Sequence, residues 1–285
     1  MSEVPTSGID LDLVARHVDK LPSPSAVVVE LLQRIDDEDM SSTQLARIIA
    51  RDQALVVRML RIANSPFYGL RGRVESIADA IAVLGLRAVR SLAATSAVAG
   101  GLAGIAPPGF DTGIFWRHSL AVAIASRALA RRVKASEDVA YVAGLLHDIG
   151  TLMLASVFPA QRAAVLTHAA EHGLHIADAE QALLGIDHAQ IGGTLAERWN
   201  FPSQICCAIS CHHRVSPERG CLLACTVHLG DVLAHALDLA GDPAERVLPI
   251  SPECWARLAL DRESGRRLFA DIEREFQALS SALFN

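Results

Sequence analysis

Aromatic residues are scarce in this chain of 285 residues: phenylalanine, tryptophan and tyrosine together make up 5%, and only two tyrosines are present. Strands favour aromatic and β-branched residues, whereas alanine and leucine are abundant here, and no strand-like alternation of apolar and polar residues stands out. Hydrophobic residues make up 51% and charged residues 20%, a balance that excludes a disordered chain. The composition therefore predicts an all-α fold with a sizeable core.

The sequence also lacks the features of secreted, membrane-spanning, nucleic-acid-binding and receiver-domain proteins. Residues 1–10 lack the basic start and apolar run of a signal peptide, so we expect a cytoplasmic protein. The apolar stretch 92–107 is rich in small residues and broken by glycines, which does not fit a membrane span of about 20 residues. A net charge of -6 disfavours nucleic-acid binding. No parallel-sheet pattern of a receiver domain occurs, so a signal would arrive from a separate protein or a small molecule.

The six cysteines do not form the paired spacing of a structural zinc site. Cys206, Cys207 and Cys211 lie close together, and a zinc site made with neighbouring histidines is a minor alternative. In a reducing compartment we expect the cysteines to be small buried side chains rather than disulfides.

Helical signals recur along the chain. Ser41 and Gln44 have the spacing of a capping box, and Ser76 with Asp79 can begin another helix that ends near Gly85. The stretch 100–109 is predicted to be a linker between two helical halves. In the second half we expect helices over 115–133, from Ser136 through the His147–Asp148 pair, over 188–199, from 202 to 213, and over 222–239. The residues 251–284 have amphipathic character.

Polar residues on apolar helical stretches of the second half are the candidates for chemistry. They are His118, His147, Asp148, His188, His212, His213 and Asp231. A single histidine on a helix is usually structural, but a buried charge is costly unless it is paired or bound to a metal. Adjacent helical positions diverge by about 100°, so His147 and Asp148 can share a metal only at the edge of their helix. The structural alternative is that His147 bonds a carboxylate of another helix and Asp148 caps a turn.

The order of several motifs resembles the HDOD family, a relative of the HD metal-dependent phosphohydrolases. The matching segments are Leu21-Pro22-Ser23-Pro24, 48–55, 61–68, 116–119, 142–150, 187–192, 199–202 and His212-His213. The likeness covers about residues 21 to 217 and is far more specific than the His-Asp pair alone.

This resemblance implies a two-lobed helical bundle of the HD-domain type. We expect an N-terminal helix over 1–20, an HDOD domain over 21–217 with lobes 21–100 and 110–217, and a C-terminal helical extension over 218–285. Matching position to motif, the metal ligands would be His118, His147, Asp148 and Asp231. The additional metal or phosphate candidates are His188, His212 and His213. The mixed nitrogen and oxygen donors suit Mn, Fe, Zn, Co or Ni, without choosing among them.

The sequence departs from the cyclic-dinucleotide hydrolases of the HD superfamily. Thr151 stands where those enzymes usually have lysine, Arg214 stands where they favour glutamate, and no Gly-Tyr-Pro follows His213. The resemblance therefore implies that a cyclic-di-GMP hydrolase is disfavoured.

Three functions remain open. The favoured one is a signalling module that acts through protein or small-ligand binding, with a retained metal site and without catalysis. The second is a metal-dependent phosphohydrolase that acts on a nucleotide or another phosphoester, and the third is a metal-free scaffold. Signalling proteins are the expected partners, a homo-oligomer is compatible with the amphipathic C-terminal segment, and no membrane or nucleic-acid partner is expected.

Overall fold

A computed structural model describes residues 8–18, 23–65, 74–102, 104–215, 222–242 and 247–284. Within these ranges all regular secondary structure is helical, as the composition predicts, and the all-α fold class is confirmed. The helices are α1 (Leu11–Val18), α2 (Ala26–Gln33), α3 (Ser42–Ile49), α4 (Gln53–Ala63), α5 (Ile77–Leu84), α6 (Leu86–Leu102), α7 (Thr112–Val133), α8 (Glu137–Leu146), α9 (Ile149–Val157), α10 (Pro159–His172), α11 (Ile176–Leu184), α12 (His188–Arg198), α13 (Ser203–Cys211), α14 (Leu222–Ala236), α15 (Pro252–Arg257) and α16 (Arg262–Phe284).

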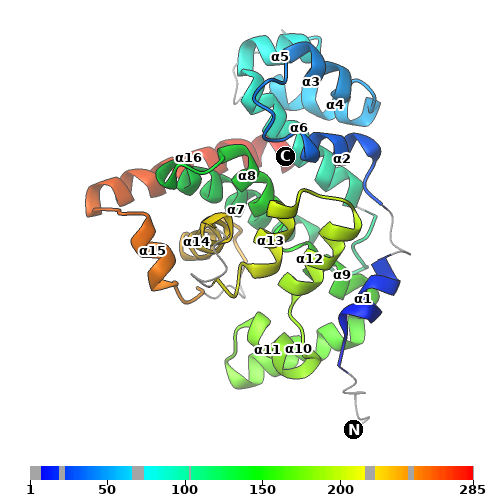
Figure 1. Ribbon diagram of the computed structural model, residues 1–285, viewed down its shortest axis with the longest axis vertical. Helices are drawn as coiled ribbons and strands as arrows, with labels where there is room; N and C mark the ends of the chain where they lie inside the picture. Colours follow the sequence, from blue (N-terminus) through cyan, green and yellow to red (C-terminus); the bar gives the residue numbers. More distant parts are fainter. Residues whose placement is uncertain are drawn as a thin grey trace.

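Helices α2 to α6 form an upper lobe, in which α3, α4 and α5 lie above α2 and α6 (Figure 1). The local sequence sets their ends: Ser41 and Gln44 form the predicted capping box of α3, and the Ser76 side chain caps α5. Gly85 then takes a positive φ of 86°, which favours glycine and separates α5 from α6.

The linker predicted from Gly100 begins later than expected. Helix α6 continues through Gly100 and Gly101 to Leu102. A Cβ at Gly100 would lie 2.0 Å from a guanidinium nitrogen of Arg58, so the missing side chain makes room for an arginine from α4. Gly100 thus serves a helix contact, and the prediction of a linker at this position was wrong.

Close packing of α7 against α8 and α14 forms the centre of the second lobe, and two glycines make it possible. A Cβ at Gly144 of α8 would lie 2.8 Å from the Val122 carbonyl oxygen, and one at Gly230 of α14 would lie 2.5 Å from Ser126 Oγ. Both contacts are to α7, whose middle is fully buried. The backbones of the three helices therefore approach closely, and each of these helices carries or ends at a predicted site residue.

Buried polar contacts join the two lobes. Arg90 of α6 is ion-paired with Asp138 of α8 and donates a hydrogen bond of 3.1 Å to the Asp37 carbonyl oxygen. The hydroxyls of Thr95 on α6 and Tyr141 on α8 lie 2.8 Å apart. Because α8 leads directly into the His147–Asp148 pair, these contacts anchor one side of the site to the upper lobe.

The C-terminal segment continues with α15 and the long helix α16, which runs beside α7 and buries Phe276 fully. Cys225 of α14 is bonded to Cys254 of α15, with their Cα atoms 5.3 Å apart. This separation lies within the range that disulfides require. The expectation that the cysteines would not form disulfides was wrong for this pair, because residues 29 positions apart in the sequence meet in the fold.

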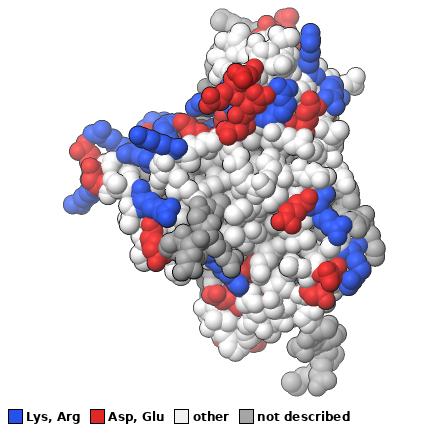
Figure 2. All heavy atoms as spheres, in the orientation of Figure 1, with Lys and Arg blue, Asp and Glu red and all other residues white. Residues whose placement is uncertain are grey.

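The surface in this orientation mixes both signs of charge, mainly around the upper lobe and the edges of the molecule (Figure 2). The segment Glu137–Val157 is apolar and long enough to cross a membrane, but 83% of its most apolar window is buried inside the protein. It spans two separate helices, α8 and α9, and its burial is that of core helices.

Candidate metal centre

The His147–Asp148 pair lies at a break between two helices and not within one. Helix α8 ends at Leu146, His147 is its C-cap, and Asp148 is the N-cap of α9. The prediction that one helix runs through the pair was therefore wrong. Adjacent side chains within one helix would point about 100° apart. At the break both side chains reach the same space, and His147 Nε2 lies 3.4 Å from Asp148 Oδ1. The carboxylate of Asp148 makes no capping bond to α9, so it faces the site instead.

Gly150 explains how α9 comes close enough to α12. A Cβ at this position would lie 1.9 Å from the carbonyl oxygen of His188 and 2.7 Å from the backbone nitrogen of Gly192. Real Cβ atoms do not approach backbone so closely, so only glycine fits here. This contact holds Asp148 beside His188, whose Nε2 lies 3.1 Å from Asp148 Oδ1.

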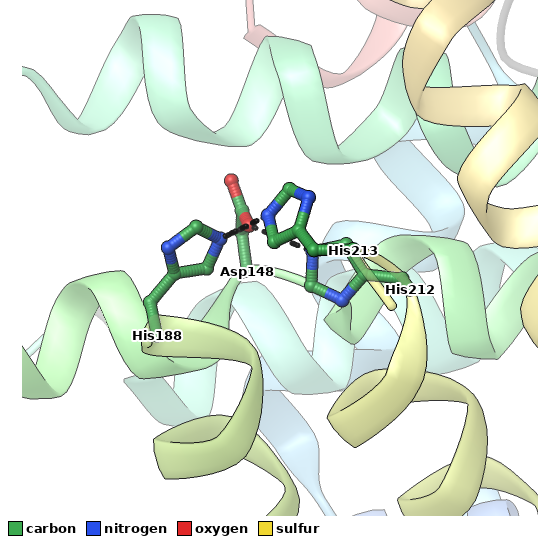
Figure 3. Close-up of side chains that lie close together, drawn as sticks. All are labelled: Asp148, His188, His212 and His213. Carbon is green, nitrogen blue, oxygen red and sulfur yellow. Dashed lines mark hydrogen bonds and ion pairs between the residues drawn. The ribbon is translucent and has the colours of Figure 1, made fainter. Parts of the chain in front are cut away.

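A buried carboxylate fixes the orientation of His188. Glu180 of α11 accepts two hydrogen bonds of 2.7 Å through the same oxygen, one from the backbone N–H of His188 and one from its Nδ1–H. Both side chains are buried. The imidazole is thereby held with Nε2 toward Asp148, and Figure 3 shows His188, Asp148, His212 and His213 gathered around one space.

The end of α13 supplies the next two histidines. His212 Nε2 lies 3.8 Å from Asp148 Oδ1, and His213 Nε2 lies 2.8 Å from His188 Nε2. In these four residues, one ligand atom of each lies within 4.8 Å of those of the others. Such spacing allows all four to contact one ion.

The remaining members come from α7 and α14. His118 Nε2 lies 3.1 Å from Asp231 Oδ1 and 3.3 Å from His147 Nε2. His235, one turn after Asp231 on α14, places its Nε2 3.2 Å from the same carboxylate oxygen. His118, Asp231 and His235 form a second group of close ligand atoms, while His118, His147 and Asp148 form a third. The structure thus brings together all seven predicted side chains and adds His235.

Hydrogen bonds at Nδ1 leave Nε2 of several rings turned toward the cluster. The Gly144 carbonyl oxygen lies 2.8 Å from His147 Nδ1, and the Ile209 carbonyl oxygen lies 2.7 Å from His212 Nδ1. An imidazole that donates Nδ1–H to an acceptor keeps a free lone pair on Nε2, the arrangement found in metal-ligating histidines.

The electrostatics favour neutral imidazoles beside ionised carboxylates. Burial lowers the pKa of His147 and of His213, and it lowers the pKa of His212 to about 3. Although burial acts in the opposite direction, His147 and His188 hold the pKa of Asp148 well below its usual value. Hydrogen bonds from His118 and His235 overcome burial in the same way and lower the pKa of the Asp231 carboxyl.

His188 is the exception in this set. Burial alone would lower its pKa, but the carboxylates of Glu180 and Asp148 outweigh burial and raise that pKa well above the ordinary value. Without a bound cation, the two carboxylates therefore favour the protonated form of His188. A metal ion at its Nε2 has to displace that proton.

Within the cluster, Nε2 of His212 is buried and lacks a hydrogen-bond partner among the described residues. Unpaired buried polar atoms are costly. His212 belongs to two groups of side chains with metal-ligand spacing, and the donor set of imidazoles and carboxylates suits a divalent transition metal. The residues present therefore fit a metal centre.

Two members of the site were not predicted from the sequence. His235 lies four residues after Asp231, a spacing that places both on one face of a helix, so this signal was available. Glu180 gave no comparable signal, because it lies on α11 and meets His188 only through the packing of α11 beside the start of α12. The Cys207 and Cys211 alternative finds no support in the described residues, since no group with metal-ligand spacing contains a cysteine.

A family model for the HDOD domain matches residues 21–215 of this sequence. The chain belongs to the HDOD domain family. The match covers the upper lobe and the second lobe as far as the end of α13, and it includes His118, His147, Asp148, His188, His212 and His213, whereas Asp231 and His235 lie beyond its end.

Solved structures resemble this HDOD chain over nearly its whole length. An HDOD domain protein of unknown function from Geobacter sulfurreducens is 25% identical, with a TM-score of 0.78 and 96% of each chain covered. A protein of Shewanella amazonensis SB2B, named provisionally as a phosphohydrolase, is 27% identical, with a TM-score of 0.73, 95% of this chain covered and 97% of that one. A protein of Marinobacter aquaeolei VT8, named provisionally as a signal transduction protein, is 25% identical, with a TM-score of 0.77, 96% of this chain covered and 61% of that one.

A curated relative, an uncharacterized protein of Treponema pallidum (strain Nichols), is 26% identical over 275 residues. The alignment covers 94% of this HDOD chain but 52% of the relative, so the chain spans about half the length of that protein.

Proposed function

We propose that this HDOD domain is a signalling module whose histidine–aspartate cluster holds divalent metal ions and binds and hydrolyses a phosphoester. The proposal rests on one observation: ligand atoms from six helices, or from residues at the ends of these helices, meet in one buried space. Proteins pay a stability cost for such a concentration of buried polar groups, and it persists where function requires it.

The cluster divides into two sets of ligands. Asp148, His188, His212 and His213 form one set, and His118, Asp231 and His235 form the other. The Asp148 carboxylate also belongs to a group with His118 and His147, so it lies between the two sets. A divalent ion bound by these side chains would supply Lewis acidity and lower the pKa of bound water.

The chain itself supplies orientation and shielding. Glu180 is fixed by the backbone N–H of His188 and accepts the Nδ1–H of its ring through the same oxygen, so rotation of the ring would break a buried hydrogen bond. The carboxylate of Asp148 is 20% exposed, whereas His147 and His212 are fully buried. The ring of His235 is similarly exposed, at 21%, so a ligand reaches the cluster from the side of Asp148 and His235, and not past the buried rings of His147 and His212.

The test is metal analysis of purified protein by mass spectrometry, followed by turnover assays with a panel of nucleotides and other phosphoesters after loading with Mn, Fe, Zn, Co or Ni. We expect bound metal and turnover in the wild type and a loss of both in Asp148→Ala. Asp178→Ala changes an exposed carboxylate of α11 and serves as the matched control. Activity that persists unchanged in Asp148→Ala would exclude this centre as its source.

A regulatory module without hydrolysis is the second candidate, and the lengths of the relatives favour it. The Treponema relative and the Marinobacter protein are both considerably longer than the part that this chain matches. A domain carried within longer chains can transmit a signal by contact with its neighbours. Metal-loaded protein that binds a phosphoester without turnover, and that retains a signalling protein in pull-downs, would support this candidate over hydrolysis.

A further inference from the structure

A buried histidine of α14, His228, belongs to none of the groups of side chains with metal-ligand spacing among the described residues. It is 6% exposed and lies on the same helix as Asp231 and His235, at a spacing that places all three side chains on one face. A buried polar ring is costly unless its nitrogens find partners. The partners of His228 therefore indicate what this residue does at the edge of the metal centre.

Both ring nitrogens of His228 are used in hydrogen bonds. Nδ1 lies 2.9 Å from the carbonyl oxygen of His212, and the backbone N–H of Ser251 donates a bond of 3.2 Å to Nε2. Because a carbonyl oxygen only accepts and an amide N–H only donates, the ring is neutral and carries its hydrogen on Nδ1. His228 thus has no lone pair left for a metal ion, and it links the end of α13 to the start of α15.

The carbonyl group that His228 holds lies between two metal ligands. Helix α13 ends at Cys211, and His212 and His213 follow it directly, beside Asp148 (Figure 3). The last carbonyl groups of a helix have no partner inside the helix, so an outside donor has to supply one. The peptide unit between His212 and His213 is planar, and a bond to its oxygen restricts how this plane can turn. His228 therefore restricts the direction in which both ligands leave the backbone.

The ring of His212 needs such support, because its Nε2 makes no hydrogen bond within the described part of the chain. Its Nδ1 lies 2.7 Å from the Ile209 carbonyl oxygen of its own helix. That contact fixes the ring relative to α13 but not relative to α14. The bond from His228 supplies a polar link between these two helices, which carry ligands of different groups.

The position of α15 fixes His228 in turn. Ser251 is the N-cap of α15, and its side chain accepts a hydrogen bond from the backbone N–H of Cys254. Cys254 is bonded to Cys225, which lies one turn before His228 on α14. The first turn of α15 is therefore attached to α14 by a disulfide, and this covalent link keeps the Ser251 N–H at the His228 ring.

We propose that His228 is a positioning residue of the metal centre, which holds the peptide between His212 and His213 so that both rings reach one metal ion. This inference rests on the proposed function, because it assumes a divalent ion at these two histidines. The residue acts through a backbone carbonyl and not through the metal, so a donor of the same geometry should replace it. A role confined to filling the core would instead be served by any side chain of similar size.

The experiment titrates the chelator-treated full chain with Co²⁺, whose visible absorption reports both the affinity and the geometry of the ligands. His228→Leu keeps the bulk of the side chain but removes the donor. In His228→Asn the amide nitrogen is attached to Cγ, as Nδ1 is in histidine, and can still donate to the His212 carbonyl oxygen. We expect about 10- to 100-fold weaker Co²⁺ binding and a changed spectrum in His228→Leu, the usual effect of losing a partner behind a metal ligand. His228→Asn should recover most of this loss and keep the wild-type spectrum.

A second pair of variants tests the same link without changing the histidine. Ser251→Pro removes the backbone N–H that donates to His228, and the φ of -67° at Ser251 already suits proline. Ser251→Ala removes the same capping hydroxyl but keeps the N–H, so it is the matched control. Ser251→Pro should bind Co²⁺ about 2- to 10-fold more weakly than Ser251→Ala, as expected for one hydrogen bond. His172→Leu removes an exposed histidine of α10 and should leave affinity and spectrum unchanged.

The outcomes separate this inference from the proposed function. A folded His228→Leu variant with the Co²⁺ affinity and spectrum of the wild type would overturn the positioning role, as would equal losses in His228→Leu and His228→Asn. If His228→Leu does not fold, equal affinities of Ser251→Pro and Ser251→Ala would overturn it. A wild-type chain that takes up no Co²⁺ would overturn the metal centre together with this inference. Failure of the metal-loaded wild type to turn over any phosphoester would count against the proposed function alone, because the test of His228 measures metal binding.

Discussion

Replacing Glu180 by glutamine tests whether the buried carboxylate tunes the metal centre. Glu180 is 3% exposed and accepts two hydrogen bonds of 2.7 Å from His188 through one oxygen. The amide of glutamine keeps the shape and an acceptor but removes the negative charge that makes the His188 ring a stronger donor to metal. Loss of such an outer partner typically weakens metal binding by about 10- to 100-fold, which corresponds to about 1.4 to 2.7 kcal/mol.

Two measurements follow from this magnitude. Calorimetric titration of chelator-treated protein with Mn²⁺ should show the weaker binding directly. Thermal unfolding should show it as lost stabilisation: a metal concentration of about 100 times the wild-type Kd stabilises the wild type by about 2.7 kcal/mol but Glu180→Gln by only about 0.4 to 1.4 kcal/mol. The shift is large enough to resolve in a domain of this size.

Asp178→Asn is the control, because it removes an exposed carboxylate from the same helix. We expect its metal affinity to stay within about two-fold of the wild type, since exposed charges contribute little. The reasoning would be refuted if Glu180→Gln bound Mn²⁺ as tightly as the wild type. It would also fail if Asp178→Asn weakened binding equally, because the effect would then be one of general charge rather than of the contact with His188.

Three further predictions concern stability. Gly150→Ala should destabilise the protein by about 3 kcal/mol or more in urea unfolding, because its Cβ would meet the His188 carbonyl oxygen at 1.9 Å; Gly265→Ala on α16, where nothing lies within 4 Å, should not. Asp138→Asn should cost about 3 to 5 kcal/mol by leaving the buried charge of Arg90 unpaired. In the metal-free protein, the interaction of protonated His188 with Glu180 and Asp148 should stabilise the fold. This contribution should be fully present at pH values below the pKa of histidine in the unfolded chain, which is about 6.5. That contribution should be lost as pH rises through the raised folded pKa, as urea unfolding at a series of pH values would show.

Each of these predictions has an outcome that contradicts it. Equal stability of Gly150→Ala and Gly265→Ala would mean that α9 and α12 can separate without cost. A loss in Asp138→Asn no larger than that in Asp271→Asn, which removes an exposed ion pair with Arg274, would show that burial of the Arg90 pair is unimportant. A pH dependence that is unchanged in Glu180→Gln would mean that His188 is not its source.

The sequence predicted most of the helices because their signals are local. The spacing of residues alone predicted the capping box of Ser41 and the serine cap before α5. The apolar periodicity of the second half predicted most of its helices. Helix α10 was missed although Pro159 at its start and Gly173, with φ of 65° at its end, are typical boundary signals. Only two of its residues, Val165 and Ala169, are buried, so the apolar periodicity that reveals other helices is weak there.

The sequence predicted most of the residues of the candidate site but not how the helices arrange them. His118, His147 and Asp148 stood out as polar residues within apolar runs, a contrast that is visible without a structure. The break after Leu146 was not visible, because residues 142 to 152 have no proline or strong turn signal to end a helix. Glu180 could not be predicted from the sequence either, since its role depends on a tertiary contact with His188 and not on a sequence spacing.

The glycines of the second lobe have a larger part in the site than their lack of a side chain suggests. Gly144, Gly150 and Gly230 each lie where a Cβ would come within 3 Å of a neighbouring helix. Each also stands one to three residues from a member of the cluster, namely His147, Asp148 and Asp231. The distances between ligand atoms are therefore set by backbone contacts between helices, because imidazole and carboxylate side chains are too short to compensate for helices held further apart. It follows that a larger residue at any of these three positions should impair metal binding while every ligand remains in the sequence.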